Sequence, residues 1–457
     1  MLFFSRIIQR LTENNRKRVF KMLYFNNSEC MEREARRLVQ LERLKKQIRN
    51  AYDNVPMYKK KFEEAGIVPE DIRELGDLKI VPFTVKDDFR ANYPFGIFGV
   101  PMDKIVRLHA SSGTTGKPVV VGYTKDDLDM WDECMARTLT AGGVTKEDIV
   151  QVTFGYGLFT GGFGAHGGSQ RLGSTTIPMS SGNTKKQIMI MQDFGSTVLC
   201  CTPSYALQIA ETAAGMGIDP KTLPIKRCFL GAEPWTEAMR NEIEERLGVK
   251  AYNIFGLTEV LGPGVAYECY CQNGMHVNED FFIAEIVDPK TFEPLPDGEP
   301  GELVFTTLTK QGVPVLRYRT KDITSISYEK CPCGRTSGKM ARIMGRTDDM
   351  LIIRGVNVFP GQIEEILLNI EGVEPQYLII LDRENSVSDN FEILVEVSEG
   401  ILQDEVRAME NLQKRILSEI HSVIGLNPKI RLVEPYTIER SEGKVKRVID
   451  RRELYNL

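Results

Sequence analysis

Apolar runs of strand length alternate with amphipathic stretches through the middle of the chain. Runs such as "DIVQVTF", "GSTTIPM" and "STVLCCTP" have the length and composition of buried strands, whereas "TKKQIMIMQDF" and "PSYALQIAETAAGM" have helical spacing. Strands and helices that alternate in this way predict a largely parallel α/β architecture. From about residue 280 to 327 the apolar runs become "FFIAEIVDP", "GELVFTTL" and "ITSISYE", with turn-rich stretches between them. This second pattern predicts an antiparallel, β-barrel-like region.

The C-terminal part of the chain follows a third pattern. Three strand-like runs, "YLIILD", "FEILVEV" and "KIRLVEP", accompany two amphipathic stretches, "GQIEEILLNI" and residues 402–424, the second of which stops at Gly425. This pattern predicts a small α+β domain. We place the boundary inside the polar link "GRTDDMLIIRGVNVFP". The expected organisation is therefore a large N-terminal domain over 1–346 and a small C-terminal domain over 347–457.

Composition and charge narrow the functional classes. The 457 residues exceed what one hydrophobic core usually holds, and the net charge of −5 argues against a nucleic-acid partner. No run of about 18 apolar residues predicts a membrane span. Residues 1–23 lack the features of a secretion signal, and we expect a surface amphipathic helix there. We therefore expect a cytoplasmic protein with no membrane partner, and a homodimer is compatible with the sequence.

The nine cysteines, an odd number in a long chain, argue against a disulfide framework. Five of them are scattered or lie in apolar runs, as small core residues do. The other four form two Cys-x-Cys pairs, in "ECYCQNGMH" and "CPCG". With the histidine of the first segment they offer five soft ligands, and four such ligands suit tetrahedral zinc. Because this spacing is tighter than the usual two-residue gap, reduced thiols without metal are the alternative.

A loop rich in glycine and hydroxyl groups, "SSGTTGKPVVVGYT", has the composition of a phosphate-binding turn. Glycines let successive backbone N–H groups face one anion, hydroxyls add donors, and a lysine adds charge. The loop is not a Walker A motif, because only two residues separate Gly113 from Gly116 and Pro118 follows Lys117. A plain Gly/Ser turn is the alternative. The candidate phosphate-binding residues are Ser111, Ser112, Gly113, Thr114, Thr115, Gly116 and Lys117.

Four further motifs follow this loop in order: "YNIFGLTE", "YRTKD", "GRTDDMLIIRG" and "SEGKVKR". The five motifs together resemble those of the adenylate-forming superfamily of acyl-CoA synthetases, adenylation domains and luciferases. The stretches "GYGLFTGG" and "CPCGRT" are similar to those of its phenylacetate–CoA ligase family. The resemblance implies ATP- and Mg²⁺-dependent, AMP-forming ligation of an aryl acetate, phenylacetate first of all, to coenzyme A through an acyl adenylate. The alternative is an adenylating enzyme that passes another aryl acid to a carrier protein or other acceptor.

The resemblance gives roles to several side chains of these motifs. The loop of residues 111–117 would hold the β- and γ-phosphates of ATP, and Thr258 would hydrogen-bond the α-phosphate. Glu259 is similar to the magnesium-binding carboxylate of the superfamily, in keeping with the preference of a hard cation for oxygen ligands. Asp322 matches the carboxylate that accepts both ribose hydroxyls. Arg346 matches a residue near the ribose and the α-phosphate.

The C-terminal part supplies the catalytic lysine in this resemblance. Lys444 in "SEGKVKR" fits that residue, which bridges carboxylate and α-phosphate oxygens in the first step; Lys446 is the rival, and the Gly-Lys pairing favours Lys444. The C-terminal domain of the superfamily rotates between the two half-reactions. By match, Asp348 is the hinge, and Gly355 would line the path of the coenzyme A arm.

Aromatic and glycine residues are the candidates for the two remaining pockets. Aromatic walls with small floors suit a flat ring, whereas ordinary core packing is the alternative. The candidate acyl-binding residues are Phe154, Tyr156, Gly157, Phe255 and Gly256. The segment "GAEPW" resembles the one that lies under the adenine. The candidate nucleotide-binding residues of this region are Gly231, Ala232, Glu233, Tyr252 and Asn253.

The resemblance also selects among the five candidate metal ligands. A cysteine at the position of Cys269 and the "CPCG" segment recur in related proteins, so Cys271 is left out. A structural zinc that staples the β region is therefore expected on Cys269, His276, Cys331 and Cys333.

Overall fold

The computed structural model describes residues 24–111, 117–354, 356–383, 389–398, 401, 406–441 and 445–452. The amphipathic helix expected over 1–23 lies outside these residues. The chain divides into two compact units. The first contains the described residues of 1–201, 224–232 and 250–342, and the second contains those of 202–223, 233–249 and 343–457. The predicted domain boundary between residues 346 and 347 stays a prediction.

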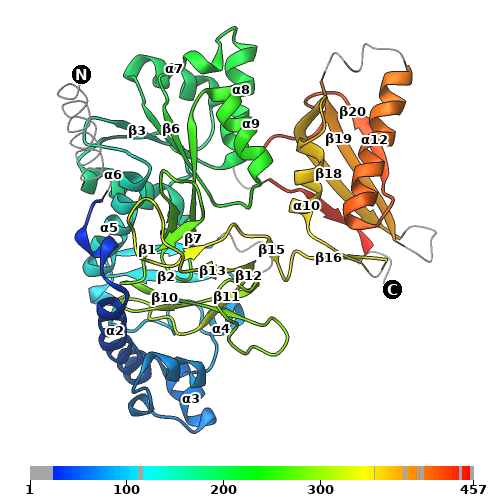
Figure 1. Cartoon of the computed structure of the whole chain (residues 1–457). Coiled ribbons are helices and arrows are strands. Elements are labelled where there is room, and N and C mark those ends of the chain that lie inside the picture. Colours follow the sequence, from blue (N-terminus) through cyan, green and yellow to red (C-terminus); the bar gives the residue numbers. More distant parts are fainter. Residues whose placement is uncertain are drawn as a thin grey trace, which may run out of the picture. The chain divides into compact units, whose positions relative to one another are not determined.

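A nine-stranded sheet forms the centre of the first unit, and its strand order is β13-β14-β9-β8-β7-β6-β5-β3-β4. The parallel half, on one side of this order, comprises β3 (Ile149–Val152), β4 (Thr175–Pro178), β5 (Val198–Cys201), β6 (Arg227–Leu230) and β7 (Lys250–Leu257). Every residue of β5 is buried, which explains its uninterrupted apolar sequence. This half confirms the parallel α/β pattern expected from the sequence (Figure 1).

The other half of the sheet is antiparallel and begins where β7 pairs with β8. Its strands are β8 (Gly262–Glu268), β9 (Met275–Val277), β13 (Ile326–Ser327) and β14 (Lys339–Met340). Strand β7 is thus the point at which the sheet changes direction. The turn that leaves β7 carries Thr258 and Glu259.

Shorter antiparallel elements complete the β structure of this unit. Strands β1 (Arg107–Ala110) and β2 (Val120–Tyr123) form a hairpin, and β10 (Phe282–Val287), β11 (Gly301–Thr307) and β12 (Tyr318–Thr324) pair in sequence. The expected antiparallel region is confirmed. The predicted run "ITSISYE" is divided, however, because β12 ends at Thr324 and β13 begins at Ile326 in the nine-stranded sheet.

Six α-helices belong to the described part of the first unit: α2 (Arg33–Asn54), α3 (Pro56–Ala65), α4 (Lys86–Ala91), α5 (Lys125–Ala141), α6 (Thr160–Leu172) and α7 (Thr184–Phe194). The 3₁₀ turns are η1 (Asn27–Cys30), η2 (Pro69–Asp71), η3 (Leu75–Ile80) and η4 (Met102–Lys104). Helix α6 is rich in glycine because it packs closely on α5. A Cβ atom at Gly168 would lie 2.3 Å from the Cβ of Met135. The glycines that follow "GYGLFTGG", namely Gly164, Gly167 and Gly168, thus allow α6 to pack closely on α5.

The second unit contains two helices from the middle of the chain, α8 (Pro203–Gly215) and α9 (Glu237–Leu247), with the 3₁₀ turn η5 (Pro220–Thr222). Its C-terminal elements are β15 (Gly345–Arg346), β16 (Leu351–Ile353), β17 (Val356–Val358), α10 (Pro360–Leu368), β18 (Val373–Asp382), β19 (Asn390–Val397), α12 (Val406–Ile424), β20 (Lys429–Val433) and β21 (Val448–Asp450). A four-stranded sheet has the order β20-β19-β18-β21.

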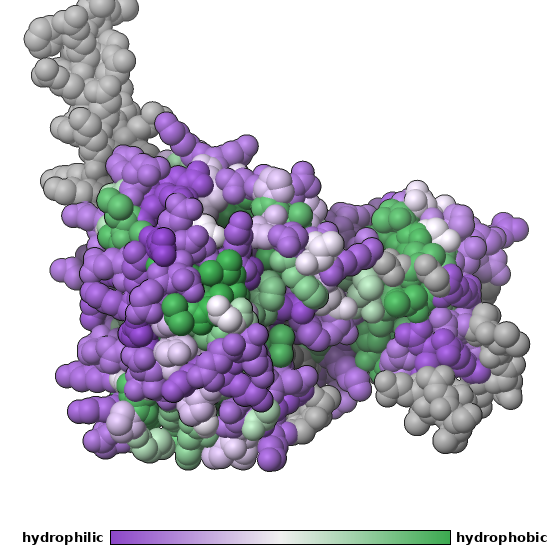
Figure 2. Space-filling view, turned by 90° about the horizontal axis from the view of Figure 1, so that it is seen from below, coloured by the Kyte–Doolittle hydropathy of each residue, from purple (hydrophilic) through white to green (hydrophobic). Residues whose placement is uncertain are grey.

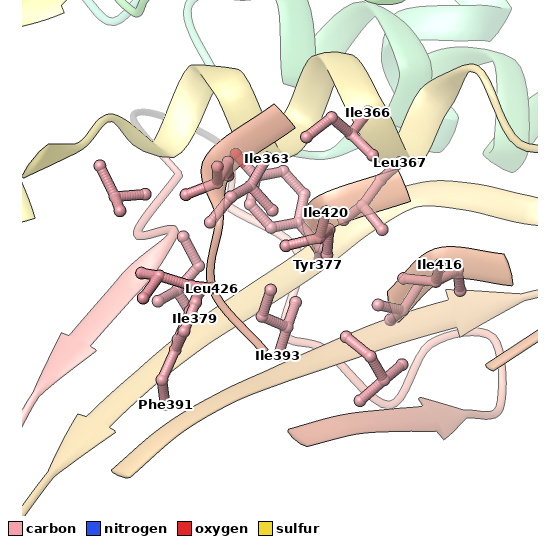
Figure 3. Close-up of a cluster of buried hydrophobic side chains, with 14 of the residues drawn as sticks. Ile363, Ile366, Leu367, Tyr377, Ile379, Phe391, Ile393, Ile416, Ile420 and Leu426 are labelled. Atoms are coloured by element: carbon pink, nitrogen blue, oxygen red, sulfur yellow. The ribbon is translucent and has the colours of Figure 1, made fainter. Parts of the chain in front are cut away.

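The core of this C-terminal sheet confirms the predicted α+β pattern. Side chains from both helices and from the inner strands meet in one cluster, including Ile363 of α10, Ile379 of β18 and Ile416 of α12 (Figure 3). Helix α10 ends at Leu368, before the predicted end of its amphipathic run, but Ile370 is still buried. Of the predicted helical stretch 402–424, residues 402–405 lie outside the described part.

The surface seen in Figure 2 is mostly hydrophilic and has small, separate hydrophobic areas. Such scattered apolar groups are normal on folded proteins. Over the described residues, none of the helices combines the length and the apolar character that crossing a bilayer requires.

Candidate active site

The candidate phosphate loop spans the β1–β2 hairpin, which fixes its two ends. The backbone N–H of Ser111 donates to the Val119 carbonyl at 2.9 Å, and the Ser111 hydroxyl oxygen accepts from the Val119 N–H at 3.1 Å. Ser111 therefore closes the base of the loop with its own side chain. Lys117 is exposed, with its ammonium 5.3 Å from the ring centroid of Tyr93. The predicted residues Ser112, Gly113, Thr114, Thr115 and Gly116 lie outside the described residues.

Thr258 and Glu259 lie at the change of direction between β7 and β8, and both are buried. The turn is tight because β7 and β8 approach each other closely at Gly256. A Cβ atom at Gly256 would lie 1.6 Å from the Gly262 carbonyl oxygen. No side chain larger than hydrogen fits there, so Gly256 has a structural role beside the predicted acyl-binding one. The turn presents a hydroxyl and a carboxylate at the end of a buried strand.

A buried lysine that sequence reasoning missed adjoins this turn. Lys310 is fully buried, and its ammonium donates to the Glu259 carbonyl at 3.3 Å and lies 4.9 Å from the Tyr123 ring centroid. The Asp127 carboxylate holds the next residues through the backbone N–H groups of Gln311 at 2.7 Å and Gly312 at 2.8 Å. Burial lowers the pKa of Lys310 to about 8, while the charges of Asp127 and Glu259 oppose that shift. The run "TLTKQG" has no pattern that predicts a buried ammonium.

The lowered pKa predicts a pH-dependent stability. Between about pH 8 and pH 10.5 the unfolded chain holds the Lys310 proton and the folded chain releases it, so this group favours folding increasingly as pH rises. Below this window the buried charge costs up to roughly 3 kcal/mol. Relative to Lys310→Met, the free energy of unfolding of the native protein should therefore rise across the window. Urea unfolding at a series of pH values measures this difference. A difference that stays constant, as expected for the exposed Lys46→Met control, would contradict the assignment.

Asp322, the candidate ribose ligand, lies on β12 and is buried. Its backbone N–H donates to the Thr320 hydroxyl at 3.0 Å, and this hydroxyl in turn donates to the Leu303 carbonyl of β11 at 2.9 Å. Asp322 therefore lies on β12 at a point where hydrogen bonds through Thr320 hold this strand to β11. This placement suits a residue that must hold a sugar in one position.

The candidate adenine segment follows β6. A Cβ atom at Gly231 would lie 2.4 Å from the Ile254 carbonyl oxygen, so the segment passes close to β7 and requires glycine there. Ala232 has a left-handed backbone with φ of 72°. On β7, Tyr252 packs on Phe229 with ring centroids 5.4 Å apart, and the Asn253 N–H donates to the Glu268 carboxylate at 2.7 Å. The aromatic and polar residues of the prediction thus lie on β7 opposite the last two residues of β6.

The candidate acyl pocket is an aromatic cluster that includes residues not predicted from the sequence. Tyr156 lies edge-on to Phe163, with centroids 5.1 Å apart, and its hydroxyl is 3.2 Å from Nδ1 of His166. Phe163 also contacts His109, whose pKa burial lowers to about 4, so that this imidazole is neutral near pH 7. Phe163 and His166 belong to the stretch "GGFGAHGG", which overlaps the end of the predicted motif, whereas His109 lies on β1.

The other predicted acyl-binding residues have differing surroundings. Phe154 is buried against Gly161, where an added Cβ atom would lie 3.2 Å from the Phe154 ring. Gly157 has φ of 112°, a backbone conformation that side chains disfavour, and open space around its Cα. Phe255 stacks on Phe305 with centroids 6.1 Å apart. Their acyl-binding roles stay predictions.

Three predicted residues with described side chains lie in the second unit. The Glu233 carboxylate accepts from the Ser204 N–H at 2.7 Å and from the Val445 N–H at 3.2 Å. Arg346 and Asp348 form a two-bond ion pair, with distances of 2.9 and 3.0 Å. This pair joins the predicted ribose-contacting arginine to the predicted hinge. Lys444, which precedes Val445, and Gly355 lie outside the described residues.

The four predicted metal ligands come together in the first unit. The ligand atoms of the set all lie within 4.8 Å of one another, and all four side chains are buried: Cys269, His276, Cys331 and Cys333. Segments more than 50 residues apart in the chain thus meet at one point, as the sequence analysis expected.

Comparisons with known proteins give the family. A family model described as AMP-binding enzyme matches residues 38–309, and one described as AMP-binding enzyme C-terminal domain matches residues 355–452. The first match spans more than half of the chain. The protein therefore belongs to the AMP-binding enzyme family.

Similar proteins refine this result. The phenylacetate-coenzyme A ligase of Thermus thermophilus is 49% identical over 445 residues, which are 94% of this chain and 100% of that protein. The phenylacetate-coenzyme A ligase of Escherichia coli is 48% identical over 418 residues, covering 91% of this chain and 95% of that protein. A crystal structure of 2-hydroxyisobutyryl-CoA ligase in the postadenylation state, with R3-HIB-AMP, matches with a TM-score of 0.89 at 29% identity and covers 95% of this chain and 93% of that one. The expectation of an AMP-forming acid–thiol ligase is confirmed.

Proposed function

We propose that the protein joins phenylacetate, or a close aryl acetate, to coenzyme A at the expense of ATP, which yields the thioester, AMP and pyrophosphate. The observation that carries the proposal is the near-half identity to phenylacetate-coenzyme A ligases over 94% of the chain. The aromatic cluster around Tyr156 supports an aryl substrate, because aromatic side chains interact favourably with another aromatic ring.

The chemistry has two steps. In the first, a carboxylate oxygen of the acid attacks the α-phosphorus of ATP, and pyrophosphate leaves with the electron pair of the broken P–O bond. In the second, the coenzyme A thiolate attacks the acyl carbon, and AMP leaves with the electrons of the acyl–oxygen bond. The first step brings two anions together, so the protein must screen charge and hold geometry.

The chain's own residues can meet these demands. In this proposal the Thr258 hydroxyl orients a phosphate oxygen, and Asp322 on β12 holds the ribose. The Glu259 carboxylate offers the hard oxygen donor that Mg²⁺ prefers, and a bound magnesium ion would neutralise charge on the phosphates. Lys310 fixes the Glu259 backbone from a buried position, so that the carboxylate leaves β7 in a defined direction.

In the second unit, the Glu233 carboxylate binds the backbone directly after Lys444. The contact between Glu233 of the "GAEPW" motif and Val445 supports the proposal that Lys444 acts in adenylation. The proposed part of Lys444 is to neutralise the carboxylate and α-phosphate oxygens as the new bond forms. We also propose that Asp348 is the hinge residue, because its ion pair with Arg346 must adjust whenever the link between the two differently patterned regions turns.

Exchange of labelled pyrophosphate into ATP tests the adenylation step. We expect exchange that depends on phenylacetate and Mg²⁺, and weaker or absent exchange with benzoate, an indole acetate or a fatty acid. Adding coenzyme A should then give the aryl acetyl-CoA thioester and AMP. Exchange without thioester formation would favour the alternative, transfer to a carrier protein. No exchange with any aryl acid would contradict the proposal.

A further inference from the structure

Two separations within the cysteine and histidine cluster of the first unit match the edges of a tetrahedral metal site. The Sγ atoms of Cys269 and Cys331 are 3.7 Å apart, and Sγ of Cys333 is 3.3 Å from Nε2 of His276. Four ligands at ordinary zinc–sulfur and zinc–nitrogen bond lengths are separated by about 3.3–3.8 Å along the edges of a tetrahedron. We propose a structural zinc site with four ligands: Cys269, His276, Cys331 and Cys333.

The "CPCG" segment folds as a turn that aims backbone N–H groups at sulfur. The Gly334 N–H donates to the Cys331 carbonyl at 2.9 Å, and Gly334 has the left-handed φ of 86° that this turn requires. The next N–H, of Arg335, points at the Cys333 Sγ at 3.4 Å. A thiolate accepts such a bond far better than a thiol does, so the turn is suited to a deprotonated, metal-bound cysteine.

The β8–β9 hairpin supplies the other two ligands. His276 lies on β9 directly opposite Tyr267 of β8, and Cys269 follows the end of β8. Nδ1 of His276 lies 3.4 Å from the Ser337 hydroxyl, while Nε2 faces the cysteines. A partner on the outer ring nitrogen is the usual way in which a metal-binding histidine is held in one orientation.

Two observations define this site as structural. All four ligand side chains are buried, so no open position faces a substrate. The fifth candidate, Cys271, is only partly buried and packs on the edge of the cluster. It therefore provides a matched control on the same hairpin.

The position of the site shows what the metal would hold together. The metal-binding turn contacts the segment before α2: the Tyr24 hydroxyl donates to the Cys333 carbonyl, and the Thr336 hydroxyl donates to the Met31 carbonyl at 2.6 Å. Arg335 and Glu29 add a fully buried ion pair at 2.7 Å. Zinc would fix the turn on the β8–β9 hairpin and thereby fix residues 24–31 on the turn.

Metal analysis of the purified full-length protein tests the proposal. After expression with zinc, elemental analysis should find one zinc per chain, and a mercurial that blocks thiols should release it from the native protein to a colorimetric indicator. Cys333→Ser should lose the metal, whereas Cys271→Ser should keep it. Cobalt in place of zinc should give the visible absorption of tetrahedral thiolate coordination.

Hydrogen exchange in residues 24–31 provides a second measurement, which does not depend on variants. Removal of zinc from the native protein should raise hydrogen exchange in residues 24–31 and 331–337, while α12 of the second unit stays unchanged. Failure to bind stoichiometric zinc even after reconstitution, a different metal in its place, or equal loss of zinc in Cys271→Ser would overturn the proposed site. None of these readouts involves substrate turnover, so they are independent of the proposed activity.

Discussion

Replacing Lys444 with alanine is expected to stop acyl-adenylate formation and to leave transfer from a supplied acyl adenylate to coenzyme A nearly unchanged. In the first step a mobile ammonium neutralises charge on the carboxylate and the α-phosphate as they come together. Loss of one such interaction in a transition state costs roughly a hundred- to a thousandfold in rate. In the second step the acid is already activated as a mixed anhydride with AMP, which is the leaving group, so no free carboxylate has to approach a triphosphate and this charge problem is absent.

Two assays on the same variant separate these steps. Pyrophosphate exchange with phenylacetate reports adenylation, and thioester formation from synthetic phenylacetyl adenylate and coenzyme A reports thiolysis. Lys446→Ala is the matched control, since it removes the same charge two residues away, and it should retain exchange. Equal loss of both activities in Lys444→Ala, or a larger loss of exchange in Lys446→Ala, would reject the assigned role.

Local pattern predicted the elements of this protein well because burial and period agree along most of them. The wholly apolar run around Cys200 is a strand buried within a parallel sheet, and the run "TKKQIMIMQDF" matches α7. The failure at "ITSISYE" has a physical reason. Buried and less buried positions alternate without a break from Thr324 to Ser327, but the chain passes at Ser325 from one sheet to another, and the sequence contains no signal for that change of partner.

The sequence offers candidates for the site where chemistry and order along the chain coincide, as at Thr258, Glu259 and Asp322, and their roles stay predictions. It was not predictable where the partners are distant in sequence. Lys310 looks like a surface lysine until the fold places it under the Glu259 carbonyl, 51 residues earlier in the chain. The same holds for the "CPCGRT" turn, whose Arg335 donates to Glu29, 306 residues away in the chain. The sequence shows that such residues are charged, but it does not show that they are buried, because their burial depends on contacts with distant segments.

Breaking the buried ion pair between Arg137 and Asp280 is expected to lower the free energy of unfolding strongly, and by more than Lys310→Met or Lys46→Met does. The guanidinium of Arg137, on α5, binds both carboxylate oxygens of Asp280 at 2.8 and 2.9 Å, and both side chains are at most 9% exposed. It also donates to the Ser28 hydroxyl at 2.9 Å and so ties the N-terminal segment to α5. Removing Arg137 takes from the buried Asp280 carboxylate its guanidinium partner, at a cost of about 3–5 kcal/mol, whereas removing Asp280 leaves Arg137 with the Glu133 carboxylate at 2.5 Å.

A double-mutant cycle measures this coupling. Arg137→Met and Asp280→Asn should each lower the free energy of unfolding strongly, and the double variant should be more stable than the sum of the two losses predicts. Trp131 lies buried on the same helix, so its fluorescence in a Trp235→Phe background reports unfolding of this region. Lys46→Met removes one member of the exposed Lys46–Glu42 pair and should change stability by less than about 1 kcal/mol. Additive losses would show that the two charges act separately, and a loss for Arg137→Met as small as that for Lys46→Met would show that α5 and the N-terminal segment do not depend on this contact.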